Sequence, residues 1–169
     1  MAQRHPDQRY PRADTILLRH AHRADEAALA EIAALALATA ASRERQFEAL
    51  DQGRAFMLAA TPWGIPQAPD RIPYAAAVGA VAAHHGIPED ETASAYLHAV
   101  TANLISAAVR LVPLGQTAGL RVLAALEAAV LRTAAETRSA TLDDLGGCAF
   151  RSDLAAMRHE TQYTRLFRS

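Results

Sequence analysis

The segment from Glu89 to Val112 restricts the fold most, because it reads as one long helix that is apolar around well over half of its circumference. At about 100° per residue, the apolar side chains on this arc are Tyr96, Leu97, Val100, Leu104, Ile105, Val109, Leu111 and Val112. A helix with so wide an apolar arc is typical of the middle of a domain. We therefore expect this segment to form the long central helix of a bundle.

Three polar side chains share the remaining stripe of the same helix. Asn103, Ser106 and Arg110 follow each other at positions i, i+3 and i+7. If another element covers this stripe, each of them needs a partner, because an unpaired buried polar group costs about 1–3 kcal/mol. We expect the stripe to form a structural polar network or to face a neighbouring subunit, and we favour ligand binding less.

Helical spacing and capping residues predict further helices on both sides of this segment. We expect one helix that starts at Asp14 and another that starts at Ser152. Between them we expect helices from Asp25 to Thr39, from Ser42 to about Ala60, from Pro73 to Gly86 and from about Thr117 to Arg138. Residues 1–13 hold two prolines and are predicted to be a flexible arm. No Val/Ile/Thr-rich alternating run predicts a strand. Alanine is abundant, and its high helix propensity and small side chain favour closely packed helices.

Two local features concern the third predicted helix and the loop that follows it. Gly53 interrupts the third predicted helix at a cost of about 1 kcal/mol relative to alanine. Either another backbone packs against it or two shorter helices meet there. The segment TPWGIPQAPDRIP, with four prolines, is a loop in which Trp63 and Ile65 are expected to anchor onto the body. Phe47, Leu50, Met57 and Leu58 are the expected core residues of the third helix.

The sequence thus predicts an all-α, single-domain bundle of about six or seven helices. We assign residues 14–157 to the helical domain and residues 158–169 to a separate C-terminal tail. At 169 residues the chain is long enough to bury a core, and 51% of its residues are hydrophobic.

Composition excludes several functional classes. All 17 basic residues are arginine, and the net charge of −1 argues against a general nucleic-acid-binding protein. Cys148 is the single cysteine, which excludes an internal disulfide and a cysteine-rich zinc site. No run of about 18 apolar residues predicts a membrane span. The first residues are polar and lack the apolar core of a secretory signal, so we expect a cytoplasmic protein.

No set of residues predicts catalysis or a stable metal site. His84 and His85 are adjacent, so on a helix they point about 100° apart and are poorly placed to share one ion. The HETQY segment lacks the second histidine of HExxH, and no P-loop or GxSxG motif occurs. We therefore expect no enzyme activity, no catalytic residue and no bound cofactor. A histidine-based metal carrier stays open as an alternative.

The chain ends in RHETQYTRLFRS, which mixes arginine with large apolar side chains. One interpretation is that this segment extends the last helix and packs Leu166 and Phe167 onto the body. The other is that it becomes ordered on binding a partner, since arginine and aromatic side chains are enriched at interface hot spots. We favour the second interpretation.

Several blocks of the sequence resemble the UreF family of urease accessory proteins. These blocks are SRERQFEALDQGRAFM, PYAAAVGAVAAHHGI, YLHAVTANLISAAVRLVPLGQTAGLRVL and RHETQYTRLFRS, and they cover roughly residues 14–169. The resemblance implies an all-helical, dimeric protein without enzymatic activity. Proteins of this family bind UreD (also called UreH) and, through it, apo-urease, and they recruit the GTPase UreG. The assembly directs nickel into the urease active site, and regulation of UreG is proposed for the family.

The resemblance also assigns roles to individual residues. The family's C-terminal block is implicated in the UreD contact, which makes partner-binding candidates of Arg158, His159, Glu160, Tyr163, Arg165, Leu166, Phe167 and Arg168. The corner formed by Pro113, Leu114, Gly115 and Gln116 matches the family motif and is expected to shape the interface or the dimer. Nickel is expected to be handled by the complex rather than held stably by this chain.

One family feature has no counterpart in this sequence. Family members usually begin with a pattern similar to P-x-G-x-F/Y-x-x-S-x-G-L-E, which is absent here. Either the start lies further upstream or the protein is a shortened relative. We therefore expect a chain less stable than its length implies, and a truncated, inactive paralogue is a further alternative.

Overall fold

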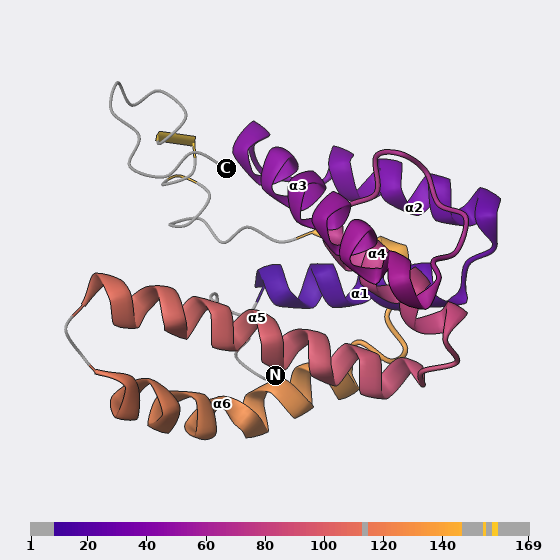
Figure 1. Cartoon of the computed structure of the whole chain (residues 1–169). Helices are drawn as coiled ribbons and strands as arrows, with labels where there is room; N and C mark the ends of the chain where they lie inside the picture. Colours follow the sequence, from indigo (N-terminus) through magenta and orange to yellow (C-terminus); the bar gives the residue numbers. More distant parts are fainter. Residues whose placement is uncertain (1–8, 113–114, 147–153, 155–156, 159–169) are drawn as a thin grey trace.

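The computed structural model describes residues 9–112, 115–146, 154 and 157–158, and every regular element in that part of the chain is a helix (Figure 1). The elements in chain order are α1 (Arg9–Arg23), α2 (Glu26–Ala38), α3 (Arg43–Ala60), the 3₁₀ turn η2 (Thr61–Trp63), α4 (Tyr74–His84), α5 (Glu89–Leu111), α6 (Gln116–Glu136) and the 3₁₀ turn η3 (Leu142–Asp144). No strand occurs among these residues, which confirms the all-α fold expected from the sequence.

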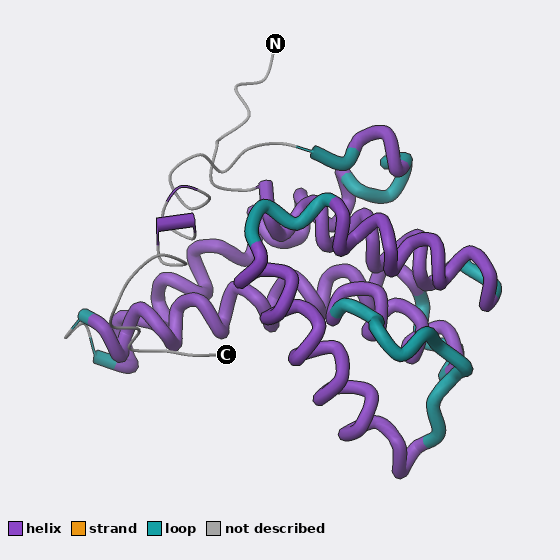
Figure 2. The backbone as a smooth tube through the Cα atoms, turned by 90° about the horizontal axis from the view of Figure 1, so that it is seen from above, coloured by secondary structure: helices purple, strands orange, loops and turns teal. Residues whose placement is uncertain are grey.

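The core lies where α1 packs against α4, with α2 and α3 on the far side of this pair from α6 (Figures 1 and 2). Leu17 of α1, Ile32 of α2, and Ala76 and Ala80 of α4 are buried together here. Because α4 presents mainly alanine to its neighbours, the surrounding helices can approach it closely. The alanine-rich sequence therefore allows close helix packing in this layer.

Two glycines mark the closest approaches in this layer. A Cβ on Gly79 of α4 would lie 2.2 Å from the carbonyl oxygen of Leu18 in α1. A Cβ on Gly53 of α3 would lie 2.1 Å from the carbonyl oxygen of Ile72, just before α4. α3 runs unbroken through Gly53, so of the two alternatives, backbone packing is the correct one.

The starts of α2 and α3 follow the predicted capping residues. Asp25 accepts a hydrogen bond of 2.9 Å from the backbone N–H of Ala28, and Ser42 accepts one of 3.2 Å from that of Arg45. Each side chain thereby satisfies a backbone N–H that has no partner within its helix. Local sequence was sufficient to place both starts.

The predicted start of the first helix is wrong. α1 begins at Arg9 rather than at Asp14, and Asp14 lies inside the helix instead of capping it. Pro11 falls in the first turn, where its missing N–H removes no helical hydrogen bond. The predicted arm of residues 1–13 is therefore helical from Arg9 onward, and residues 1–8 lie outside the described part.

Some expected core residues are at the surface instead. Phe47 and Leu58 of α3 are exposed, whereas Leu50 and Met57 are half-buried. Trp63 and Ile65, which we expected to anchor the proline-rich loop, are 75% and 38% exposed. Ile72 anchors that loop instead, because it is 3% exposed and belongs to the core around α1 and α4.

α5 matches its predicted bounds, but it is central along only part of its length. Tyr96 and Leu97 in its first half are buried, whereas Leu104 and Leu111 in its second half are 62% and 73% exposed. Figures 1 and 2 show the second half of α5 and the first half of α6 extending beyond the other helices. The wide apolar arc of α5 is therefore covered by other helices only along its first half.

Two further expectations concern the chain after α6. The DDLGG turn begins with η3, which Thr141 and Asp144 cap reciprocally. Of the helix expected from Ser152, only Leu154, Met157 and Arg158 are described, and they are helical. No helix in the described part of the chain is long and apolar enough to cross a membrane.

Candidate protein-interaction surface

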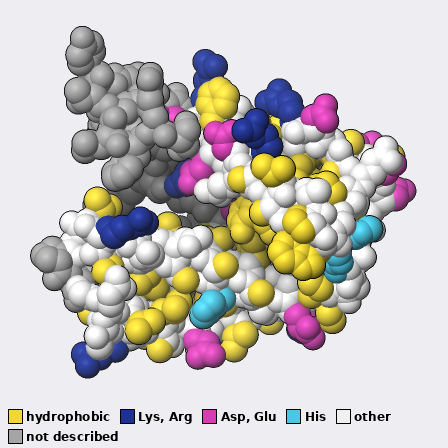
Figure 3. Space-filling model, in the orientation of Figure 1, with side chains coloured by type: hydrophobic (Ala, Val, Ile, Leu, Met, Phe, Trp, Pro, Cys, Tyr) yellow, Lys and Arg dark blue, Asp and Glu magenta, His cyan; other side chains and the backbone are white. Residues whose placement is uncertain are grey.

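An exposed apolar surface of the described chain lies on the hairpin formed by α5 and α6. We call it the hairpin surface, and its large side chains, between 39% and 73% exposed, are Leu104, Leu111, Val112, Leu120, Val122, Leu126 and Leu131. Figure 3 shows hydrophobic side chains spread over this part of the molecule, at the lower left. Several large apolar side chains exposed on one pair of helices are typical of protein interaction sites.

These exposed side chains do not hold the hairpin together, because α5 and α6 pack through a separate seam. Near the tip, a Cβ on Gly119 would lie 2.8 Å from a methyl group of Val109. Near the base, Leu97 packs against Val130 and Ala134, and all three are buried. The leucines on the hairpin surface are therefore available to another surface.

A network of charged side chains fixes the base of the hairpin to α1. The Arg19 guanidinium is 1% exposed and binds Glu89, Asp90 and the Ala134 carbonyl oxygen, the last two at 2.9 and 2.8 Å. It also donates a hydrogen bond of 3.2 Å to the hydroxyl of Thr137. One side chain of α1 thus connects the start of α5 with the end of α6.

Two more arginines complete this network. Arg23 donates hydrogen bonds of 2.5 and 2.6 Å to Glu89, and Arg138 pairs with Asp90 at 2.9 Å. Burial alone raises the pKa of Glu89, but the hydrogen bonds from Arg23 and Arg19 outweigh it and lower that pKa overall. Sequence reasoning missed this network because its arginines and carboxylates are far apart in the chain.

A second, partly buried polar contact joins α1 to α5. The Tyr96 hydroxyl donates a hydrogen bond of 3.1 Å to the Asp14 carboxyl. Burial raises the pKa of Asp14 to about 6, although the hydrogen bond from Tyr96 and the charge of Arg45 partly offset this effect. Burial and the Asp14 charge also raise the pKa of Tyr96.

The predicted polar stripe lies at the surface of α5. Asn103, Ser106 and Arg110 are all exposed, so none of them needs a partner within the fold. Arg110 donates a hydrogen bond of 3.3 Å to the carbonyl oxygen of Ser106 on its own helix. Contact with a neighbouring subunit remains a prediction for this stripe.

The predicted corner and tail are only partly described. Gly115, with a φ of +74°, and Gln116 lie at the tip of the hairpin, and Pro113 and Leu114 lie outside the described residues. Of the tail candidates, Arg158 is described and exposed. The others lie outside the described residues: His159, Glu160, Tyr163, Arg165, Leu166, Phe167 and Arg168.

Three of the described histidines, His20, His22 and His85, lie within hydrogen-bonding distance of backbone carbonyl oxygens. The rings of His84 and His85 pack edge to face with centroids 5.1 Å apart, and Nε2 of His85 lies 3.0 Å from the carbonyl oxygen of Gly64. Nε2 of His22 lies 2.8 Å from the carbonyl oxygen of Ile87. The described residues include no group of three or more His, Cys, Asp or Glu side chains placed to hold a metal ion.

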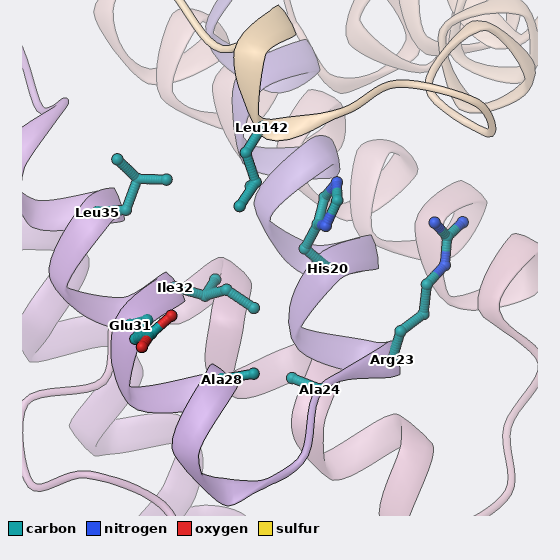
Figure 4. Close-up of a pocket in the computed structure, with 8 residues that line it drawn as sticks. All are labelled: His20, Arg23, Ala24, Ala28, Glu31, Ile32, Leu35 and Leu142. Carbon is teal, nitrogen blue, oxygen red and sulfur yellow. The ribbon is translucent and has the colours of Figure 1, made fainter.

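A groove of about 500 Å³ lies between α1 and α2 and is closed at one end by η3 (Figure 4). Ile32 and Leu142 point into it, and His20, Arg23 and Glu31 stand at its sides (Figure 4). Arg23 is bound to Glu89, so it is held by the fold rather than available to a substrate. The groove can accept an apolar side chain but shows no paired acid and base.

Comparisons with known proteins agree with the resemblance found in the sequence. The family model UreF matches residues 7–127. The urease accessory protein UreF of Rhodopseudomonas palustris is 51% identical over 168 residues, which cover 92% of this chain and 70% of the relative. The proteins of the same name from Bradyrhizobium diazoefficiens and Xanthobacter autotrophicus are 55% and 49% identical, covering 92% and 95% of this chain and 69% and 71% of the relatives. The chain therefore belongs to the UreF family.

Proposed function

We propose that this protein is a urease accessory protein that acts as a scaffold and not as an enzyme. With UreD (UreH) and UreG it binds apo-urease and assists nickel insertion, and it regulates the UreG GTPase. The observation that carries this proposal is its membership of the UreF family, with relatives about half identical in sequence that bear the name urease accessory protein. Nickel is the cargo of the complex in this proposal rather than a resident ligand, and the complex works in the cytoplasm.

The hairpin surface supports a scaffolding role. A protein that works by association needs apolar area that its own fold does not use, and the hairpin surface provides it. The base of the hairpin is held by Arg19, which binds the start of α5 and the end of α6. A projecting surface with a rigid base can bind a partner without reorganising the core, which lowers the entropic cost of binding.

We assign the contacts within the complex as follows. The tail residues from Arg158 to Arg168 bind UreD, and the corner at Gly115 and Gln116 shapes an interface at the hairpin tip. The outer face of α6 forms the contact between two copies of the chain in a homodimer. This face carries Leu120, Ala124 and Leu131, flanked by Arg121 and Glu127.

The charges on α6 support packing of two copies. Arg121 and Glu127 are both exposed and lie six residues apart on the helix. When two α6 helices pack antiparallel, Glu127 of each copy lies near Arg121 of the other. The small side chain of Ala124 then allows the two helices to approach closely. The neighbouring stripe of Asn103, Ser106 and Arg110 on α5 adds polar contacts at the edge of this interface.

Co-expression with UreD and UreG tests the assembly. We expect the full chain to co-elute with both proteins in size-exclusion chromatography. The Leu166→Asp/Phe167→Asp variant should lose UreD, whereas Leu58→Asp, which changes an exposed leucine on α3, should retain it. Failure of the unchanged chain to bind either protein would refute the proposed assembly.

Genetic complementation tests the biological role. In a strain that lacks its own UreF, expression of this chain should restore urease activity, with nickel content of the purified urease as the direct readout. Expression without restored activity or nickel would identify an inactive paralogue.

A further inference from the structure

The groove between α1 and α2 has an apolar floor that the fold leaves open (Figure 4). Ile32 is 6% exposed, and Leu35 and Leu142 beside it are half-buried. Ala24 and Ala28 form part of its walls, and their small side chains keep the groove wide. A volume of about 500 Å³ lies within the range of natural ligand sites. The groove therefore has room for large apolar side chains from outside the chain.

The basic side chains on the α1 wall of the groove are held by contacts within the fold. The Arg23 guanidinium donates hydrogen bonds of 2.5 and 2.6 Å to the two carboxylate oxygens of Glu89. Nε2 of His20 lies 3.2 Å from the carbonyl oxygen of Ala140. Arg23 is thus paired and is not free to receive a carboxylate from a partner.

Carboxylates stand at the other edges of the groove. Glu31 on α2 is exposed and has no hydrogen-bond or ion-pair partner among the residues that the structure describes. α2 itself contains no basic residue. Asp143 is also exposed, and it follows Leu142, which lies at the end of the groove closed by η3. An apolar floor between carboxylates is complementary to a segment that combines apolar side chains with positive charge.

We propose that this groove is a docking site for a basic amphipathic helix of a partner protein. Such a helix carries apolar side chains at positions i and i+4 of one face, which pack on Ile32, Leu35 and Leu142. Arginine or lysine on either side of them pairs with Glu31 and Asp143. In this mode of recognition the apolar anchors fill the groove, and the charges set the orientation of the helix and exclude acidic segments.

The geometry favours a helix over a small molecule or a metal ion. A small-molecule site directs several polar groups toward one ligand. Here Glu31 and His20 stand on different walls, and Arg23 is paired with Glu89. No group of three or more His, Cys, Asp or Glu side chains in the described part of the chain is placed to hold a metal ion. The apolar floor is thus the main feature that an occupant of the groove meets.

This inference goes beyond the proposed function. The contacts assigned there use the tail, the tip of the hairpin and the outer face of α6, and none of them uses the groove between α1 and α2. The test below needs neither UreD nor UreG nor urease. Docking in the groove can therefore fail while the proposed function holds, and the reverse is equally distinguishable.

Methyl NMR of the full chain, titrated with a designed peptide, locates the contact directly. The probe is an alanine-based helical peptide with leucine at positions i and i+4 and arginine on both sides of them. We expect the methyl signals of Ile32, Leu35 and Leu142, the groove methyl signals, to shift on titration. Those of Leu120 and Leu131 on the hairpin surface should stay in place. A control peptide with glutamate instead of arginine should bind about tenfold more weakly or less, because it meets like charges.

Three variants of the chain test the shape and the charge of the groove. Glu31→Lys should weaken binding of the arginine peptide about tenfold or more, because it reverses the charge at the edge. Asp51→Lys makes the same change of charge at an exposed position on α3 and should alter binding by less than about twofold. Ala28→Leu fills part of the groove and should abolish the shifts. Circular dichroism and urea denaturation confirm that each variant folds.

Four outcomes would overturn the proposal. Groove methyl signals that stay unchanged at millimolar peptide would show that the groove does not accept the helix. Shifts confined to the hairpin surface would place the peptide there instead. Equal losses with Glu31→Lys and Asp51→Lys would show only a general attraction between charges. Groove methyl signals that shift only after Leu166→Asp/Phe167→Asp would show that the chain's own tail occupies the groove.

Discussion

Tyr96 on α5 donates a hydrogen bond of 3.1 Å to the carboxyl group of Asp14 on α1. This contact places an ionisable group where α1, α4 and α5 meet, beside the buried Leu18, Ala75 and Ala93. Burial raises the pKa of Asp14 from its ordinary value of 3.8 to about 6. The folded chain therefore binds this proton more tightly than the unfolded chain does.

The raised pKa of Asp14 predicts a specific dependence of stability on pH. Its contribution to stability is fully present below pH 4 and is lost as pH rises through about 6. Asp14→Asn removes this loss and keeps an acceptor for the Tyr96 hydroxyl. We expect the variant to gain about 1–3 kcal/mol in unfolding free energy relative to the unchanged protein between pH 4 and pH 7.

Urea denaturation at a series of pH values measures this gain. Asp51→Asn, at an exposed position on α3, is the matched control and should change stability by less than about 0.5 kcal/mol. A stability difference between Asp14→Asn and the unchanged protein that stays constant from pH 4 to pH 7 would contradict the prediction.

The Arg19 network predicts a large effect from one side chain. Arg19→Met removes the guanidinium that binds Glu89, Asp90 and the end of α6, and it leaves buried acceptors without their donor. Removing one partner of a buried ion pair costs about 3–5 kcal/mol, and we expect a loss in this range by urea denaturation. Arg54→Met, at an exposed position on α3, controls for the general effect of replacing arginine and should cost less than about 1 kcal/mol. Equal effects of the two substitutions would show that the network does not stabilise the fold.

The contrast between these contacts and the helix starts shows what the sequence alone could predict. Asp25 and Ser42 cap helices through bonds to residues three positions away, so local reading placed both starts correctly. Arg19 binds Thr137, which lies 118 residues away, and no local pattern indicates that pairing. The same limit hid the contact of Asp14 with Tyr96 and led to its assignment as a cap.

Periodicity also identified apolar faces without showing which of them are covered. On α3, Phe47 and Met57 were both expected in the core. Phe47 is 52% exposed, whereas Met57 is half-buried and packs against the core. On α5, Tyr96 and Leu111 share a face, yet the first is buried and the second exposed. The difference depends on where neighbouring helices end, which is a property of the whole fold.

The close contact at Gly79 predicts that alanine is not tolerated there. Alanine favours a helix by about 1 kcal/mol over glycine, but its Cβ would lie 2.2 Å from the Leu18 carbonyl oxygen, and the backbone of α1 would have to move. We expect Gly79→Ala to lower the unfolding free energy by about 1–3 kcal/mol or more. Gly119→Ala should cost less, because its nearest neighbours are the methyl ends of Val109 and Ile105. Thermal and urea denaturation of both variants provide the comparison, and the reverse order would contradict this account of the helix packing.

The exposed leucines of α6 predict a separation between stability and association. Leu120 and Leu131 are 67% and 54% exposed, so the Leu120→Ser/Leu131→Ser variant should unfold within about 1 kcal/mol of the unchanged protein. Leu97→Ala, in the buried seam between α5 and α6, should cost about 2–5 kcal/mol. If α6 forms the homodimer contact, the serine variant should sediment as a monomer at concentrations where the unchanged chain is a dimer, because it loses the apolar centre of that interface. A serine variant that unfolds normally and still forms the dimer would exclude this face of α6 from the interface, and the search would then move to the exposed residues of α5.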